Sequence, residues 1–256
     1  MDHPLTPLTN WFVDLPAIRC PTCGQGMLTR VNEFDAQQSA KSRDDLGDPD
    51  AFDPDLIGGV FTGMLICGYT GCTEKVAVVG QYGVDIDPSG RSNSWMNCYK
   101  ITYARPAFIL VACPPGTPEK VRAAATAAAE IAWADPSSAA GRLRVAVEEL
   151  LTCHRIPRST INRNHKRVRL DTHQRIEKFA QMKPDVARVL MAVKWIGNSG
   201  SHEGGLGIDD VLEGAQMLSH ALGLLYDTSV PVLMRRVNEV NRRGKRGPRS
   251  RPRTGQ

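Results

Sequence analysis

A lysine, an asparagine and a histidine lie within nine residues of one another where a predicted helix gives way to a glycine-rich loop. They are Lys194, Asn198 and His202, and five of the eleven residues 197–207 are glycine. An imidazole exchanges protons near neutral pH, and an ammonium and an amide bind phosphate oxygens. The three residues therefore predict a site for proton transfer on a phosphate ester. The alternative is structural: Asn198 caps the helix, His202 bonds a backbone carbonyl and Lys194 extends along the surface.

Two cysteine pairs in the first third of the chain have the spacing of metal ligands. Cys20 and Cys23 are separated by two residues and Cys67 and Cys72 by four, with glycines in or beside both turns. Four thiolates in a tetrahedral arrangement are typical of a structural Zn²⁺ site that has no open coordination position. The sequence therefore predicts zinc as a structural cofactor held by these four residues. A redox-active dithiol or buried free thiols are the alternatives.

Positive charge is concentrated in two segments. The net charge is +5, yet residues 235–256 hold nine Lys/Arg against one Glu, so the remainder of the chain is slightly acidic. The other basic segment begins at residue 155. Both suit contact with the phosphate backbone of RNA or DNA, and an ordinary solvated loop and a solubilising terminus are equally consistent with them. The predicted nucleic-acid-binding residues are Arg155, Arg158, Arg163, Lys166, Arg167, Arg169, Arg242, Arg243, Lys245 and Arg246.

The elements that must position these residues divide the chain into a β part and a helical part. Alternating apolar residues predict short strands at 61–66, 75–79, 82–86, 99–103 and 107–112. A 3.6-residue periodicity predicts helices at 117–133, 138–153, 171–180, 184–196 and 208–226. The predicted fold class is α+β: a small zinc-ribbon-like β module with an acidic loop (1–113), an α-helical bundle (114–234) and a disordered basic tail (235–256).

The composition is that of a globular protein, 41% hydrophobic and 23% charged. No apolar run approaches the ~20 residues of a membrane-spanning helix, and the first residues lack the basic start of a signal peptide. We therefore expect a soluble, cytoplasmic protein with no membrane partner. In that compartment, seven cysteines indicate thiols or metal ligands in preference to disulfides.

Several motifs of the helical part resemble one protein family. They are Val193-Lys-Trp-Ile-Gly-Asn-Ser-Gly-Ser-His202, Arg144-Val-Ala-Val-Glu148, Leu224-Leu-Tyr226, Pro114-Pro-Gly-Thr-Pro118 and Trp133-Ala-Asp-Pro136. Together they resemble domain-of-unknown-function family 4145 over about residues 114–226, and members of that family commonly carry an N-terminal cysteine knuckle. The family is similar in turn to the HEPN domains (higher eukaryotes and prokaryotes nucleotide-binding). These are helical bundles, often dimeric, that are abundant in restriction, toxin–antitoxin and phage-defence loci.

This resemblance implies two candidate functions. The first is a nucleic-acid-binding accessory or sensor protein of a prokaryotic defence or restriction system, with a restriction or toxin–antitoxin protein as partner. The second is a metal-independent endoribonuclease, because several HEPN groups cleave RNA with an arginine, a polar residue and a histidine. His202 matches that histidine and Asn198 the polar residue, whereas Lys194 stands where related sequences often have arginine. A homodimer formed through the helical domain is also implied. A non-catalytic protein-interaction scaffold is the third candidate.

Overall fold

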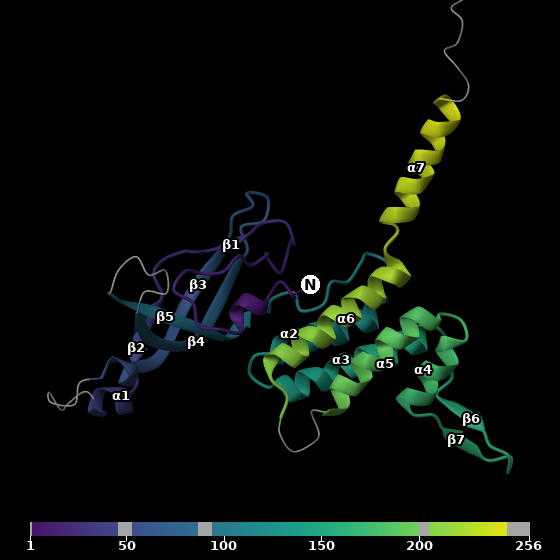
Figure 1. Cartoon of the computed structure of the whole chain (residues 1–256), viewed down its shortest axis with the longest axis horizontal. Helices are drawn as coiled ribbons and strands as arrows, with labels where there is room; N and C mark the ends of the chain where they lie inside the picture. Colours follow the sequence, from purple (N-terminus) through teal and green to yellow (C-terminus); the bar gives the residue numbers. More distant parts are fainter. Residues whose placement is uncertain (1, 46–52, 87–93, 200–204, 245–256) are drawn as a thin grey trace, which may run out of the picture.

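The computed structural model describes residues 2–45, 53–86, 94–199 and 205–244. Along the described chain an antiparallel sheet comes first and a set of helices follows (Figure 1). The prediction of an N-terminal sheet followed by C-terminal helices is therefore confirmed. None of the helices within these ranges is both long and apolar enough to cross a bilayer.

Five strands form the N-terminal sheet: β1 (Leu28–Arg30), β2 (Asp35–Gln38), β3 (Gly58–Cys67), β4 (Lys75–Ile86) and β5 (Trp95–Arg105). Strand β3 pairs with β1, β2 and β4, and β4 pairs with β5, all antiparallel. Phe61 and Leu65 on β3 are fully buried, and the Phe61 ring stacks on Phe34 with centroids 4.6 Å apart. Three short helical segments accompany the sheet: η1 (Thr6–Leu8), α1 (Ala40–Asp45) and η3 (Pro54–Leu56).

Three of the five predicted strands differ from the structure. The segments 75–79 and 82–86 are one strand, β4, whose pairing with β5 shifts register between Val79 and Gly80. Residues 107–112 are not a strand but an irregular linker from the sheet to the helices. Pro106 ends the ladder because it lacks the N–H that a strand must donate. The apolar residues that suggested a strand, Phe108 and Leu110, are instead buried as the linker crosses to the helices.

Five helices make up the bundle: α2 (Glu119–Ile131), α3 (Pro136–Cys153), α4 (Thr172–Ala180), α5 (Pro184–Ser199) and α6 (Ile208–Tyr226). Helix α3 contacts each of the other four. Its apolar stripe, which includes Leu143 and Leu150, is fully buried. Helix α5 approaches α3 so closely at Gly197 that a Cβ there would lie 2.9 Å from the carbonyl oxygen of Ala140. Glycine at this position therefore sets how near the end of α5 comes to α3.

The basic segment that follows α3 contains a two-stranded hairpin, whose strands were not predicted from the sequence. Strands β6 (Ser159–Ile161) and β7 (Arg167–Arg169) pair antiparallel and project from the bundle near α4 (Figure 1). The turn is held by Asn162, whose side-chain oxygen accepts from the N–H groups of Asn164 and Lys166, both at 3.0 Å. An Asx turn of this kind builds a hairpin loop without glycine.

The prediction of a disordered tail from residue 235 is wrong for its first ten residues. A further helix, α7 (Ser229–Gly244), continues the chain beyond α6 and extends away from the bundle (Figure 1). Leu233, Val237 and Val240 lie at spacings of four and three residues, which is a helical period that the high arginine content of the segment obscured. The rest of the predicted tail, 245–256, lies outside the described residues.

A buried histidine joins the first residues to the linker that precedes the bundle. The Nε2 atom of His3 lies 2.8 Å from the Leu110 carbonyl oxygen, while Nδ1 accepts the Leu5 N–H at 3.1 Å. Nε2 therefore carries the proton, and Nδ1 must stay unprotonated to keep its bond. Burial lowers the pKa of His3 from its ordinary 6.5, and the bond to Leu110 opposes this shift only in part.

We expect this junction to lose stability in mild acid. The folded state binds a proton on His3 less readily than the unfolded state does. The contribution of His3 to the free energy of unfolding is therefore complete above about pH 6.5 and declines as the pH falls below that value. The change to test is His3→Gln, which removes the titrating group. Thermal unfolding between pH 7.5 and 5.5 should show a shallower fall in midpoint for the variant than for the wild type. Parallel curves for the two proteins would contradict the assignment.

Candidate functional site

The four predicted metal ligands converge on one point of the N-terminal module. Cys20 and Cys23 lie in the loop before β1, Cys67 ends β3 and Cys72 lies in the turn before β4. The four sulfur atoms all lie within 4.8 Å of one another. The Sγ–Sγ distance is 3.8 Å between Cys20 and Cys72 and 3.7 Å between Cys23 and Cys67. A tetrahedral ion with bonds of about 2.3 Å holds its sulfurs about 3.8 Å apart, so this cluster is compatible with a metal site.

In each of the two cysteine turns, the knuckles at 20–26 and 67–72, a backbone N–H group donates a hydrogen bond to a cysteine sulfur. The Gly26 N–H donates to Cys23 Sγ and the Tyr69 N–H donates to Cys67 Sγ, each at 3.4 Å. A Cβ at residue 26 would lie 2.3 Å from the sulfur of Cys67, so only glycine fits between the two knuckles. A side-chain bond of 2.8 Å from Thr22 to Glu74 also ties the two loops together. These contacts hold the two cysteine turns together in an arrangement that is compatible with a metal site.

The thiols of the cluster differ in how readily they ionise. Hydrogen bonds from the backbone of Gly26 and Gln25 lower the pKa of Cys23 to about 6. The backbone at Glu74 acts in the same direction on Cys72, but burial and the three neighbouring sulfurs outweigh it and raise that pKa to about 12. Burial also raises the pKa of Cys67. A cation that binds all four sulfurs at neutral pH must therefore displace protons, and its affinity decreases as the pH falls.

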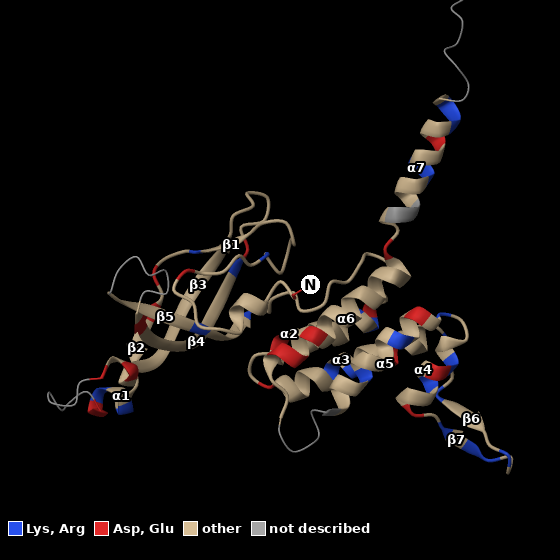
Figure 2. Ribbon diagram, viewed as in Figure 1, with Lys and Arg blue, Asp and Glu red and all other residues tan. Residues whose placement is uncertain are grey.

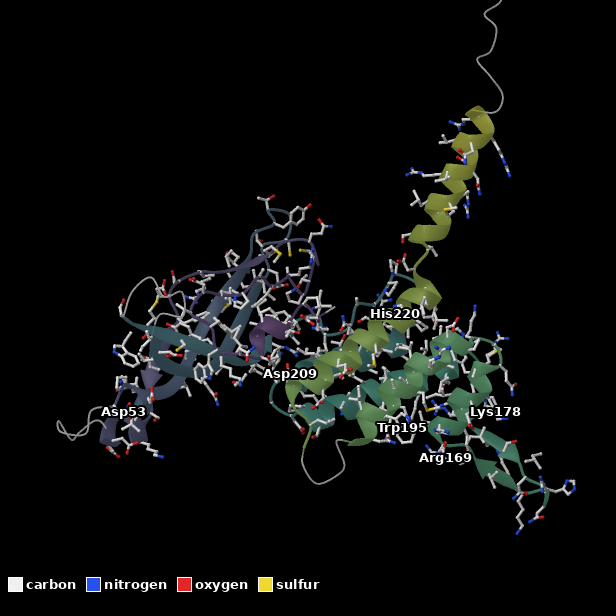
Figure 3. The ribbon with its side chains drawn as sticks, in the orientation of Figure 1. Asp53, Arg169, Lys178, Trp195, Asp209 and His220 are labelled. Atoms are coloured by element: carbon white, nitrogen blue, oxygen red, sulfur yellow. The ribbon has the colours of Figure 1, made fainter. Side chains whose placement is uncertain are left out.

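The three residues predicted at the helix end are not brought together by the described contacts. Helix α5 runs to Ser199, so Asn198 belongs to its last turn and not to the loop. Lys194 is only 8% exposed, and its Nζ lies 3.4 Å from the centroid of the Trp195 ring, which is labelled in Figure 3. His202 lies outside the described residues. The ammonium of Lys194 thus contacts an indole, a favourable cation–π geometry.

Asn198 contacts an arginine from a different helix and not the lysine predicted to act with it. Arg144 on α3 donates from Nη1 to Asn198 Oδ1 at 3.2 Å. The same guanidinium lies 4.0 Å from Glu148, which is four residues further along α3 and therefore on the same face of the helix. Glu148 accepts in addition from the Thr172 hydroxyl at 2.6 Å, so α3, α4 and α5 meet in one polar network. The sequence held no sign of the link from Arg144 to Asn198, because the two residues are 54 positions apart.

The basic residues predicted between positions 155 and 169 all lie at the surface of the protein. Each of the six is exposed, no acid occurs in this stretch, and Figure 2 shows the blue of Lys and Arg along β7 and the turn. Among the ion pairs of the described chain, only that of Arg158 with Glu149, at 3.1 Å, involves one of these six. The hairpin also presents the apolar side chains of Ile161 and Val168 to solvent. It is therefore a projecting arm with largely uncompensated positive charge.

A pocket of about 330 Å³ opens at the base of this arm. Arg158 and Arg169 line it from the hairpin, and Arg175 and Thr172 line it from α4. Arg175 is 4% exposed and donates to the carbonyl oxygens of Glu148 and Ile156 and to the hydroxyl of Thr152. These bonds anchor the arm to α3 and α4. Arg169, labelled in Figure 3, remains exposed at the rim.

The other basic residues predicted to bind nucleic acid belong to the C-terminal segment. Arg242 and Arg243 lie in the last turn of α7 and are exposed. Lys245 and Arg246 lie outside the described residues. The last turn of a helix favours positive side chains, so the two described arginines also have a structural reason for their position.

Two family models match separate parts of the chain. Residues 126–243, from the middle of α2 to the end of α7, match a family described as a domain of unknown function (DUF4145). The resemblance predicted from the motifs of the helical part is confirmed to this extent. Residues 13–108, which include the sheet and the four clustered cysteines, match a second domain of unknown function (DUF8608). No curated protein and no solved structure matches the chain.

Proposed function

We propose that this protein binds nucleic acid through the β6–β7 hairpin and serves as an accessory or sensor component of a prokaryotic restriction or defence system. The observation that carries the proposal is that residues 155–169 hold six exposed basic side chains, four of them on the hairpin itself, and no acidic residue. Charge placed in this way contacts phosphates independently of base sequence. The context of restriction or defence comes from the HEPN resemblance of the helical part.

The shape of the arm supports contact with a nucleic-acid backbone. Arg167 and Arg169 lie two residues apart on β7 and therefore point to the same face of the hairpin, and Arg163 and Lys166 extend the charge around the turn. A two-stranded ribbon is narrow enough to enter a nucleic-acid groove. The exposed Ile161 and Val168 add apolar surface for sugars or unpaired bases.

In this proposal the four-cysteine cluster holds a structural Zn²⁺ ion. Cys20, Cys23, Cys67 and Cys72 provide four sulfurs and leave no position for a reacting ligand, so the ion stabilises the fold and supplies no chemistry. The N-terminal module then acts as a docking unit for a protein partner or for nucleic acid.

The direct test is the binding of labelled single-stranded RNA, single-stranded DNA and duplex DNA, followed by fluorescence anisotropy from 0.05 to 0.2 M salt. We expect binding that weakens steeply with salt and depends little on sequence. No retention of any of these probes at about 0.1 M salt, where phosphate contacts are still felt, would overturn the proposal and leave the protein-interaction scaffold.

A second candidate function, a metal-independent endoribonuclease, is favoured by the contact between Arg144 and Asn198. The sequence lacks an arginine beside Asn198, and α3 supplies one at 3.2 Å. In this mechanism His202 removes the proton of a 2′-hydroxyl, the 2′-oxygen attacks phosphorus, and the 5′-oxygen leaves with a proton from water or the imidazole. Arg144 stabilises the charge on the phosphorane oxygens and Asn198 orients them.

For this candidate we expect RNA cleavage without added Mg²⁺ or Mn²⁺, yielding a 2′,3′-cyclic phosphate and a 5′-hydroxyl. His202→Ala and Arg144→Ala should each lower the rate by at least about 100-fold. The control is Arg142→Ala, an exposed arginine of the same helix, which should leave the rate unchanged. Salt-sensitive binding without cleavage by the wild type would exclude the enzyme and retain the binding protein.

A further inference from the structure

A buried arginine at the base of the hairpin lacks a counter-charge in direct contact. Arg175 is 4% exposed, yet it takes part in none of the ion pairs of the described chain. Its hydrogen bonds go to uncharged groups, the carbonyl oxygens of Glu148 and Ile156 and the hydroxyl of Thr152. Its Nε has no partner among the described residues. Because a buried charge is normally paired with an opposite charge, this guanidinium is suited to bind an anion.

Two further arginines line the same pocket of about 330 Å³ as Arg175. One of them, Arg158, pairs with Glu149 at 3.1 Å, whereas Arg169 is exposed and forms no ion pair with the residues that the structure describes. Burial, followed by the nearby charge of Arg158, lowers the pKa of Arg175 from its ordinary value. The pocket therefore holds positive charges that disfavour one another, and an anion between them would relieve this repulsion.

The two acids that line the pocket are bound to other groups. The carboxylate of Asp171 caps α4 and accepts from the Gln174 N–H at 2.8 Å, and that of Glu148 accepts from the Thr172 hydroxyl at 2.6 Å. Three guanidinium groups against two carboxylates leave the lining with a net positive charge. The pocket also lies beside the first turn of α4, and the N-terminal end of a helix favours negative charge.

The burial of Arg175 indicates what form the anion takes. A phosphate that reaches this side chain must enter the pocket end on, which is difficult for a phosphate linked to sugars on both sides. A terminal phosphate has one such link and carries about −1.5 to −2 charges at pH 7, and its oxygens match the fork of a guanidinium. The volume is near the lower limit of small-molecule sites, about 300–1,000 Å³, so the pocket suits a single terminal group.

We propose that this pocket binds a phosphomonoester, the terminal phosphate of a nucleic-acid strand whose internal phosphates contact the hairpin. Arg175 lies at its floor, and Arg158 and Arg169 hold the group from the hairpin. The proposal rests on the proposed binding of nucleic acid by the hairpin. It adds a preference for one chemical kind of strand end, which the exposed charges of the arm alone would not produce.

The test compares single-stranded oligonucleotides of one sequence that carry a 5′-phosphate, a 3′-phosphate or hydroxyl groups at both ends. Affinities are measured by fluorescence anisotropy at about 0.1 M salt, where phosphate contacts are felt. We expect a phosphate at one of the two ends to raise affinity at least about 10-fold over the hydroxyl ends. Equal affinities for the three probes would overturn the proposal and leave binding by the hairpin intact.

Two variants that remove the same charge separate the pocket from the arm. Arg169→Gln alters the exposed rim of the pocket and should abolish the preference for a terminal phosphate. Arg163→Gln alters the turn of the hairpin, outside the pocket, and should weaken binding of all three probes alike while the preference persists. Loss of the preference in both variants, or in neither, would contradict the assignment. Arg175 is left intact because its bonds anchor the hairpin.

A free ligand tests the pocket without the arm. A nucleoside 5′-monophosphate should raise the thermal unfolding midpoint of the wild type, whereas the nucleoside should not, and Arg169→Gln should lose the shift. This result without binding of any oligonucleotide would retain a phosphomonoester site and overturn the proposed function of the hairpin. A missing shift together with a missing end preference would show that the pocket binds no phosphate.

Discussion

Replacing Cys67 with alanine is expected to unfold the N-terminal module while the helical bundle persists. Cys67 is 3% exposed, and its sulfur lies within the cluster that joins β3 to the loop before β1. Structural zinc contributes about 10–16 kcal/mol of apparent binding free energy in zinc-finger peptides at pH 7, whereas a whole domain has a net stability of about 5–15 kcal/mol. Loss of one ligand, or chelation of the ion, should therefore remove the stability of the sheet.

Limited proteolysis measures this effect region by region. We expect cleavage of Cys67→Ala within residues 13–108 and a resistant fragment that contains the bundle, together with loss of bound zinc. The control is Cys153→Ala, because Cys153 is exposed and lies outside the cluster. Less than half an equivalent of zinc in wild-type protein purified without chelator, with a wild-type cleavage pattern for Cys67→Ala, would show that the cluster is not a metal site.

The second large effect is expected from neutralising the hairpin. In a variant with glutamine at Arg163, Lys166, Arg167 and Arg169, affinity for RNA or DNA should fall at least about 100-fold at 0.1 M salt. The slope of log affinity against log salt should decrease by about 1 for each lost phosphate contact. The hairpin itself should survive, because its turn depends on Asn162 and not on these charges.

A control variant with the same net charge distinguishes the contribution of the hairpin to binding from that of the overall charge of the protein. Glutamine at Lys41, Arg43, Lys120 and Arg188 removes the same four charges from exposed positions outside the hairpin. We expect this control to bind nearly as well as the wild type. Equal losses in the two variants would mean that binding follows overall charge, and no loss in the hairpin variant would move the interface elsewhere.

Local spacing was enough to predict the cysteine cluster. Two residues between Cys20 and Cys23 and four between Cys67 and Cys72 are short enough for each pair to share a turn. The antiparallel pairing of β1 with β3, where Leu28 lies opposite Cys67, then brings the two turns together. The five helices of the bundle were likewise predicted from periodicity, because each buries one stripe. In both cases, the deciding contacts lie close in sequence or repeat regularly along it.

Contacts between distant or short elements could not be predicted in this way. Arg144 meets Asn198 only because Gly197 lets α5 approach α3 closely. The three-residue strands of the hairpin are too short for a period-two pattern to emerge from a basic segment. In α7 the many arginines hid the helical period of Leu233, Val237 and Val240. The contact of the Lys194 ammonium with the Trp195 ring is likewise one that no spacing rule gives.

The bond between His3 and Leu110 has a consequence for synthesis on the ribosome. All four clustered cysteines have been synthesised by residue 72, well before the carbonyl group to which the imidazole bonds. The imidazole must wait for a carbonyl made 107 residues later, which by then leads directly into the bundle. The first module to be made is therefore completed only as the second one begins to appear.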